Sequence, residues 1–223
     1  LKILNLKKHK DVSNDKNGKK NKFKNKREKK TVIPLNTSGN VKPTIFENNT
    51  SMALISVDST SGDMRIEREK WADLVKNRGG NYNPNAQGDD PSIDWSGKMN
   101  IKFDAKGIRL PKDSSCFFYN LGGYVYNAEN IDTSDVLDMN RMFKQAKNFT
   151  YSASTFDLSK WNTRKVLDMH GMFYGVGINF GDESAMFPDI SKWKTNNVTD
   201  MSDMFRDCYR FKRTKFDVSK WSV

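Results

Sequence analysis

The chain has 223 residues, a formal net charge of +11 at neutral pH and two cysteines. This length suffices for one or two domains, and so few cysteines exclude a fold that is held together by disulfides. No apolar run reaches the roughly 18 residues that a membrane-spanning helix needs, so the sequence as given predicts no transmembrane segment.

Most of the charge lies at the beginning of the chain. Residues 1–33 hold 13 Lys or Arg residues against 3 Asp or Glu residues, a net charge of +10. A Lys/Asn-rich segment with few apolar residues cannot bury enough surface to offset chain entropy, so we expect residues 1–35 to be a disordered basic tail or linker. The simpler interpretation of this tail is a solvated spacer, and the alternative is a weak electrostatic contact with an anionic surface or a nucleic acid.

Residues 36–100 are expected to be a linker followed by an N-terminal cap. An apolar run at 53–58 (ALISVD) is typical of a strand, and a helix is expected over about 63–77, where Gly79 and Gly80 end it. One face of this helix is apolar and would cover the exposed core of the first repeat, although a partner-binding helix is an alternative. That face carries Ile66, Trp71, Leu74 and Val75.

Between the helix and the repeats the pattern changes to turns and short strands. Residues 81–91 (NYNPNAQGDDP) have the composition of a loop. Residues 99–104 and 107–111 are expected to form a hairpin or the first strands that lead into the first repeat.

The rest of the chain repeats one phrase. It reads VLDMNRMF at 136–143, VLDMHGMF at 166–173 and VTDMSDMF at 198–205, and the three copies are closed by FDLSKW, PDISKW and FDVSKW. The closing segments alternate with the period of a strand, and the Met-Phe segments have the spacing of short helical turns. We therefore predict that residues 101–223 form an α/β repeat solenoid of about four units, each with one strand and a short helical segment, in the manner of leucine-rich repeats.

These repeats resemble the BspA-like leucine-rich repeats of mycoplasma surface proteins. The resemblance rests on the DMxxMF core and on the segments that precede it, IDTSDV at 131–136, WNTRKV at 161–166 and WKTNNV at 193–198, and it covers about 64–223. It implies a surface-exposed or secreted protein with a role in adhesion or host interaction, whose anchor would lie in a segment not present in this chain.

Two sets of aspartates recur at equivalent positions of the repeats; we call each set a file. Asp138, Asp168 and Asp200 each precede the first Met of a repeat, where they could hold a hard cation or could cap the following turn by accepting backbone N–H bonds. The capping interpretation is the simpler one.

The second file lies in the closing segments and supplies the candidate binding site. Its polar residues alternate with buried apolar ones, so they are expected to face outward from successive strands and to form an extended surface for a partner. The predicted partner-binding residues are Asp157, Ser159, Lys160, Asp189, Ser191, Lys192, Asp217, Ser219 and Lys220. The recurring Trp161, Trp193 and Trp221 are instead expected to pack at the corner of each unit.

No pattern in the sequence indicates an enzyme. The two histidines, His9 and His170, lack a second ligand at metal spacing, and no phosphate-binding loop or nucleophile motif occurs. We expect no cofactor and no small-molecule substrate. The favoured function is a protein-binding module for a host or bacterial surface macromolecule; the alternatives are a nucleic-acid or anionic-surface binder acting through the tail, and a spacer or variable surface antigen without a specific ligand.

Overall fold

A computed structural model describes residues 30–46, 49–57, 62–97, 99–147, 156–176, 187–208 and 217–222. The predicted tail, apart from its last residues, lies outside this part of the chain. Lys30–Val32 form strand β1 and Leu35 is fully buried, so the folded part begins inside the segment that the sequence assigned to the tail.

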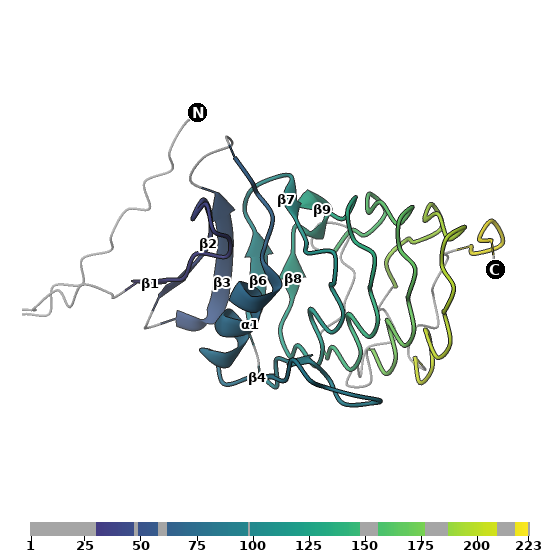
Figure 1. Ribbon diagram of the computed structural model, residues 1–223, viewed down its shortest axis with the longest axis horizontal. Helices are drawn as coiled ribbons and strands as arrows, with labels where there is room; N and C mark the ends of the chain where they lie inside the picture. Colours follow the sequence, from purple (N-terminus) through teal and green to yellow (C-terminus); the bar gives the residue numbers. More distant parts are fainter. Residues whose placement is uncertain are drawn as a thin grey trace, which may run out of the picture.

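A five-stranded sheet forms one end of the molecule, and the repeats extend away from it (Figure 1). Its strand order is β1-β2-β3-β6-β8, with antiparallel pairing among the first three strands and parallel pairing from β3 onward. Its remaining strands are β2 (Val41–Phe46), β3 (Asn49–Val57), β6 (Asn100–Phe103) and β8 (Val125–Tyr126). The strands expected at 53–58 and 99–104 are therefore confirmed as parts of β3 and β6.

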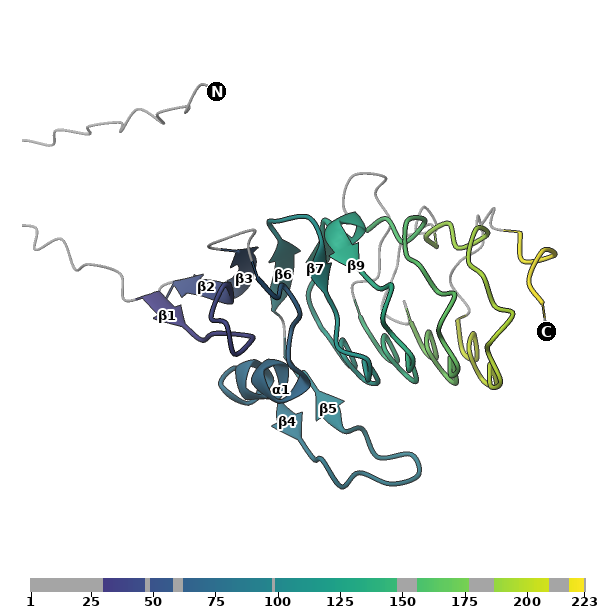
Figure 2. The same cartoon turned by 45° about the horizontal axis from the view of Figure 1, so that its top comes forward.

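Four short strands and a 3-10 helix lie outside the five-stranded sheet. The antiparallel hairpin of β4 (Asn81–Tyr82) and β5 (Ile93–Asp94) projects from the body of the molecule (Figure 2). The remaining elements are β7 (Ile108–Arg109), which pairs in parallel with β9 (Ile131–Asp132), and the 3-10 helix η1 (Ala128–Asn130).

Helix α1 (Arg68–Lys76) lies on one face of the five-stranded sheet (Figure 2). It is shorter than the expected span of about 63–77, because the preceding residues are extended and Arg65 forms a bridge with Arg109. The helix ends at Lys76, and three residues later Gly79 has φ +82°. Gly80 lies so close to Asp94 that a Cβ there would be 2.4 Å from the Asp94 carbonyl oxygen.

The repeats stack in register, but each unit is built from turns. Single parallel bridges join Asp113 to Asp138, Asp138 to Asp168 and Asp168 to Asp200. We call each eight-residue segment that starts at one of these aspartates a rung. The four rungs are 113–120, 138–145, 168–175 and 200–207.

The predicted α/β repeat solenoid is wrong. Among the described residues α1 is the one α-helix, the named strands end at Asp132, and the repeats contain neither of the two elements expected for each unit. The expected helical segments fail because the fourth and eighth residue of every rung have positive φ, which breaks the chain into consecutive tight turns. These positions are Cys116, Asn120, Arg141, Gln145, Gly171, Gly175, Asp203 and Asp207.

Aromatic ladders fill the core of the stack. Phe143 and Phe173 are stacked with ring centroids 5.7 Å apart, and Trp161, Trp193 and Trp221 continue in a second ladder at 6.3 Å per step. The indole N–H of Trp193 donates to the carbonyl of Leu158 in the preceding unit at 2.9 Å. The expectation that these tryptophans are packing residues is confirmed.

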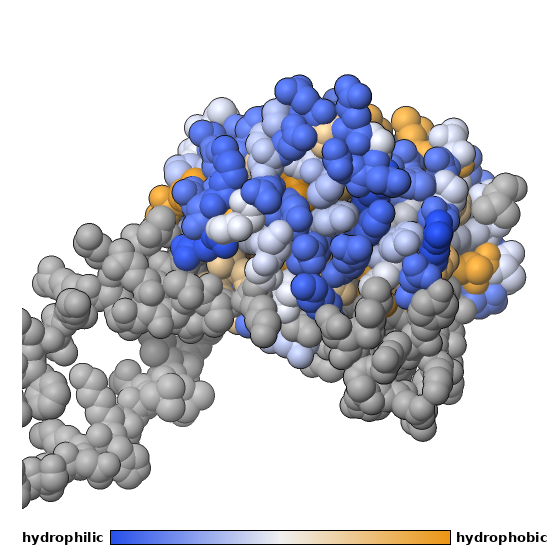
Figure 3. Space-filling model, turned by 90° about the horizontal axis from the view of Figure 1, so that it is seen from below, coloured by the Kyte–Doolittle hydropathy of each residue, from blue (hydrophilic) through white to orange (hydrophobic). Residues whose placement is uncertain are grey.

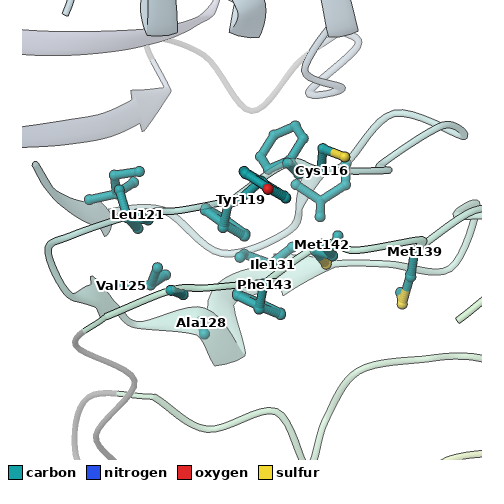
Figure 4. Close-up of a cluster of buried hydrophobic side chains, with 14 of the residues drawn as sticks. Cys116, Tyr119, Leu121, Val125, Ala128, Ile131, Met139, Met142 and Phe143 are labelled. Carbon is teal, nitrogen blue, oxygen red and sulfur yellow. The ribbon is translucent and has the colours of Figure 1, made fainter. Parts of the chain in front are cut away.

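The cap, formed by the sheet and α1, packs against the repeats at the first rung. Trp71 of α1 stacks on Phe117 with ring centroids 4.1 Å apart, and Phe117 packs edge-on against Phe118. From there the core continues into the second rung, where Met142 and Phe143 lie beside Tyr119 and Val125 (Figure 4). One hydrophobic core therefore runs from the sheet into the repeats.

Candidate functional site

The predicted binding residues lie in turns, not on strands. In the first closing segment Leu158 is buried, Lys160 is exposed, and the N–H of Trp161 donates to the carbonyl of Leu158 at 3.1 Å, which closes a tight turn. The other two segments repeat this geometry. The flat strand face predicted for these residues is therefore absent, and an edge of successive turns takes its place; we call it the SKW edge (residues 157–161, 189–193 and 217–221).

The aspartates of the SKW edge accept backbone hydrogen bonds within their own turns. Asp157 Oδ1 accepts the N–H of Ser159 at 2.8 Å, and Asp189 and Asp217 bind Ser191 and Ser219 in the same way. Hydrogen bonds from the serine side chain and backbone lower the pKa of Asp189. What this edge offers a partner is its three exposed lysines, Lys160, Lys192 and Lys220.

The first aspartate file has the capping role that the sequence indicated. The carboxylate of Asp138 accepts the N–H of Asn140 at 2.7 Å, and Asp168 and Asp200 accept the N–H groups of His170 and Ser202 at 2.7 and 2.8 Å. Each aspartate therefore opens its rung by binding the N–H two residues later. Among the described residues, no group of three or more His, Cys, Asp or Glu side chains is arranged to hold a metal ion.

A second polar surface follows the rungs, and sequence reasoning missed it. We call it the rung face; it consists of the third, fourth and seventh residues of the rungs, which are buried at several positions of the first three rungs and exposed in the fourth. Its centre is Tyr174, whose ring has Lys144 Nζ 4.4 Å from its centroid on one side and the Arg206 guanidinium 5.5 Å away on the other. These three residues occupy the same rung position in successive repeats. In the sequence this repeat position stands out only because its residue varies from one repeat to the next. Whether it faces outward depends on which residues have positive φ, and the sequence does not show that.

Charges around Tyr174 fix the orientation of the cluster. Arg206 forms an ion pair with Asp203 at 3.4 Å, and a hydrogen bond with Asp207 raises the pKa of the Tyr174 hydroxyl. The site combines an aromatic ring with two cations; Lys144 and Tyr174 are half-buried, and Arg206 is exposed. Such a cluster can bind acidic or aromatic groups on a partner surface.

Next to this cluster runs a short polar chain. His170 Nδ1 lies 2.7 Å from Ser202 Oγ, which in turn donates to Asp200 Oδ1 at 2.6 Å. The serine stands between the imidazole and the carboxylate, whereas a hydrolytic triad requires the imidazole between the serine and the carboxylate. The His170–Ser202–Asp200 arrangement therefore does not have the order of a nucleophile–base–acid relay.

The β4–β5 hairpin covers the N-terminal part of the rung face. Asp89 in its loop lies 3.2 Å from the guanidinium of Arg141, and Asn120 donates to Asp94 Oδ1 at 3.0 Å. Seen from below, the side on which the hairpin lies in Figure 1, the surface is largely hydrophilic (Figure 3). The third and fourth rungs extend beyond these hairpin contacts, and they carry Tyr174 and Arg206.

A stack of in-register rungs, closed at one end by a sheet and a helix, defines this molecule as a repeat protein. The chain belongs to the family described as "Mycoplasma protein of unknown function, DUF285", whose model matches residues 112–223 and therefore all four rungs. Searches of curated proteins and of solved structures gave no significant match. Within the described residues, no helix has the length and apolarity needed to cross a membrane.

Proposed function

We propose that this protein is a binding module, surface-exposed or secreted, that attaches to a host or bacterial surface protein through the rung face. Kinship with the BspA-like repeats of mycoplasma surface proteins is part of this proposal at the level of the repeat sequence. The observation that carries it is the Tyr174 cluster, where an aromatic ring is flanked by Lys144 and Arg206 on a rigid stack.

Tyr and Arg are the residues that most often dominate the binding energy of protein interfaces. A rigid scaffold reduces the entropy lost on binding, and here the rings and backbone of neighbouring rungs hold the cluster in place. Because two cations flank the ring, the partner surface that fits best presents carboxylates around an apolar or aromatic group. The SKW edge offers exposed lysines without a neighbouring aromatic surface, since its tryptophans are engaged in the core.

The test measures saturable binding of the full chain to a panel of host matrix proteins and host cells. One variant carries Lys144→Glu and Arg206→Glu, and the matched control carries Lys160→Glu and Lys192→Glu, which reverse the same number of charges on the SKW edge. We expect saturable binding that falls by about tenfold or more in the first variant and stays nearly unchanged in the control. Circular dichroism and thermal unfolding establish that both variants remain folded.

Other outcomes would contradict the proposal in distinct ways. Loss of binding in the control alone would assign the contact to the SKW edge. Binding retained by both variants would point to another part of the chain, such as the basic N-terminal segment. The absence of saturable binding to every panel member would favour a spacer or a surface antigen.

A further inference from the structure

A buried arginine lies within the rung face. Arg141 is the fourth residue of the second rung, and its side chain is 10% exposed. A cation that has lost most of its water needs a counter-charge and hydrogen-bond acceptors close by. Among the described residues the Arg141 guanidinium has one such partner, because its Nη2 lies 3.2 Å from Asp89 Oδ1, whereas its Nε is buried without a hydrogen-bond partner. The protein therefore satisfies this guanidinium only in part.

The acid that pairs with Arg141 comes from outside the repeats. Asp89 lies in the loop of the β4–β5 hairpin, which extends along the side of the rungs (Figure 1 and Figure 2), and its side chain is 91% exposed. The backbone hydrogen bonds of this loop join its own residues, as from Asn83 to Ser92. The ion pair thus ties the loop to the second rung through a carboxylate that water also reaches, and ion pairs with an exposed member contribute little to stability.

Arg141 has the donor arrangement of a carboxylate site. A guanidinium binds a carboxylate most strongly through two parallel N–H···O bonds. The Nε and Nη2 atoms lie on one edge of the guanidinium, and Asp89 uses Nη2 alone. A carboxylate that accepts from both nitrogens would satisfy Arg141 better than Asp89 does. Asp89 therefore occupies this site as an incomplete ligand.

Arg141 lies beside the Tyr174 cluster. A Cβ added at Gly171 would be 3.5 Å from Arg141 Cγ and 3.8 Å from Tyr174 Cβ, so both side chains border this glycine. Arg141 adds a third cation to Lys144 and Arg206, which flank the Tyr174 ring. The three cations extend along the rung face from the second rung to the fourth. A partner segment with several carboxylates matches this row of charges.

We propose that Arg141 is a carboxylate-binding residue of the rung face, and that Asp89 of the hairpin occupies it until an acidic segment of a partner protein takes its place. The proposal rests on the binding function proposed above for the rung face, and it adds the chemistry of the partner segment and a competitor within the protein. Displacement of Asp89 costs little, because its carboxylate is already largely in water. The base of the hairpin is anchored separately, since Asn120 donates to Asp94 there at 3.0 Å.

A competitor within the protein has a measurable consequence. It lowers the apparent affinity for the partner in proportion to the fraction of molecules in which Arg141 is free. Removal of the Asp89 carboxylate should therefore strengthen the binding of an acidic ligand. Loss of an ion pair that only stabilises the fold would leave that binding unchanged or weaken it.

The experiment titrates the full chain with an acetylated peptide of four glutamates and, as the uncharged control, with a peptide of four glutamines. Binding is followed by NMR at the Nε–H of Arg141 and at the amide of Gly171, so that peptide bound to the basic N-terminal segment gives no signal. One variant carries Asp89→Asn. Its matched control carries Asp90→Asn, which removes the same charge from the neighbouring exposed residue. A third variant, Arg141→Gln, removes the site and is read at Gly171.

We expect the Asp89→Asn protein to bind the glutamate peptide about tenfold more tightly than the parent, and the Asp90→Asn protein to bind it like the parent. The Arg141→Gln protein should lose the response at Gly171. Equal affinities in the two Asn variants would overturn the proposal, as would a failure of all variants to respond to the glutamate peptide. If Arg141→Gln does not fold, the comparison of the Asn variants decides, because Arg141 is intact in both.

The result is separate from the test of the proposed function. Panel binding that depends on Lys144 and Arg206, together with equal peptide affinities of the Asp89 and Asp90 variants, would keep the proposed function and remove the Arg141 site. The expected peptide affinities without binding to any panel member would support the Arg141 site and contradict the proposed function.

Discussion

At the scale of single residues, the conformation of the rungs depends on positions that most side chains avoid. Gln145 has φ +59° and is exposed, whereas Gly175 holds the equivalent position in the third rung. A left-handed conformation costs an ordinary residue about 1–2 kcal/mol, and part of the gain from glycine is offset by its greater freedom in the unfolded chain.

Gln145→Gly should therefore stabilise the protein by roughly 0.5–1 kcal/mol. Lys147→Gly is the control, since Lys147 is a nearby exposed residue without a positive φ, and we expect it to be neutral or destabilising. Denaturant unfolding measures both. A Gln145→Gly protein less stable than the parent would show that the left-handed residue is held by interactions of its side chain.

The carboxylate of Asp138 makes the stack sensitive to pH. Burial raises its pKa to about 6, and the carboxylates of Asp113 and Asp168 add to the effect. Because the folded pKa lies above the unfolded value, the folded state binds the proton more tightly, and the contribution of Asp138 to stability falls as the pH rises from about 4 to about 6.

Asp138→Asn keeps a side-chain oxygen for the N–H of Asn140 and removes the charge. At pH 7 it should be more stable than the parent by about 1 kcal/mol, a value discounted for partial exposure, and at pH 4 the two should be nearly equal. Asp200→Asn should act with the opposite sign, because hydrogen bonds from Ser202 lower the pKa of Asp200 and its contribution is lost as the pH falls. Unfolding curves at several pH values measure both, and equal pH profiles for the two variants would contradict this account.

At the scale of elements, the cap is the part that closes the stack. The Arg68 side chain is 11% exposed, donates to the carbonyls of Asp113 and Ser115, and pairs with the Asp113 carboxylate at 3.1 Å. Its removal leaves acceptors at the end of the core without donors.

Arg68→Ala should destabilise the protein by about 2–3 kcal/mol. Lys70→Ala, an exposed position on the same helix, should change stability by less than about 0.5 kcal/mol. The free energies of unfolding in urea give the comparison. Similar small effects in both variants would mean that the carbonyl edge of the first rung is adequately hydrated without its cap.

The sequence predicted the repeat and its core better than its backbone. The in-register Asp138, Asp168 and Asp200 and the stacked tryptophans follow from spacing, because a repeated unit needs the same filler in every copy. The strand predicted at FDLSKW failed because Asp157 binds the N–H of Ser159 and so favours a turn over an extended ladder. The rung face was missed because Arg141 and Gln145 have positive φ, which Arg and Gln seldom adopt. These two residues determine which side chains of the rung face outward.

Thr133, Thr163 and Thr195 were missed for a similar reason. They are almost fully buried, and each hydroxyl both donates to and accepts from the backbone of the next unit, as Thr163 does with the carbonyl and the N–H of Lys194. A threonine in a polar segment gives no sign in the sequence that it is buried. The stack thus holds its units together with side-chain as well as backbone hydrogen bonds.

At the scale of the whole molecule, the structure is a directional stack with unlike ends. The fourth residue of a rung donates its N–H to the next rung, as Arg141 does to His170 and Gly171 to Ser202. At the N-terminal end, Trp71 and Trp95 of the cap donate to the carbonyl of Phe117 in the first rung, whereas the N–H of Asp203 in the fourth rung reaches no backbone acceptor among the described residues. The side of the stack carries the rung face, where the proposed partner would bind.

Amide hydrogen exchange of the unmodified protein tests this directional account most directly. The donors of the second and third rungs, Arg141 and Gly171 among them, should exchange slowly, whereas the equivalent Asp203 in the fourth rung should exchange at least about tenfold faster. Equal protection at Arg141, Gly171 and Asp203 in the monomeric protein would contradict the account, because the N–H of Asp203 would then be hydrogen-bonded like its counterparts in the earlier rungs.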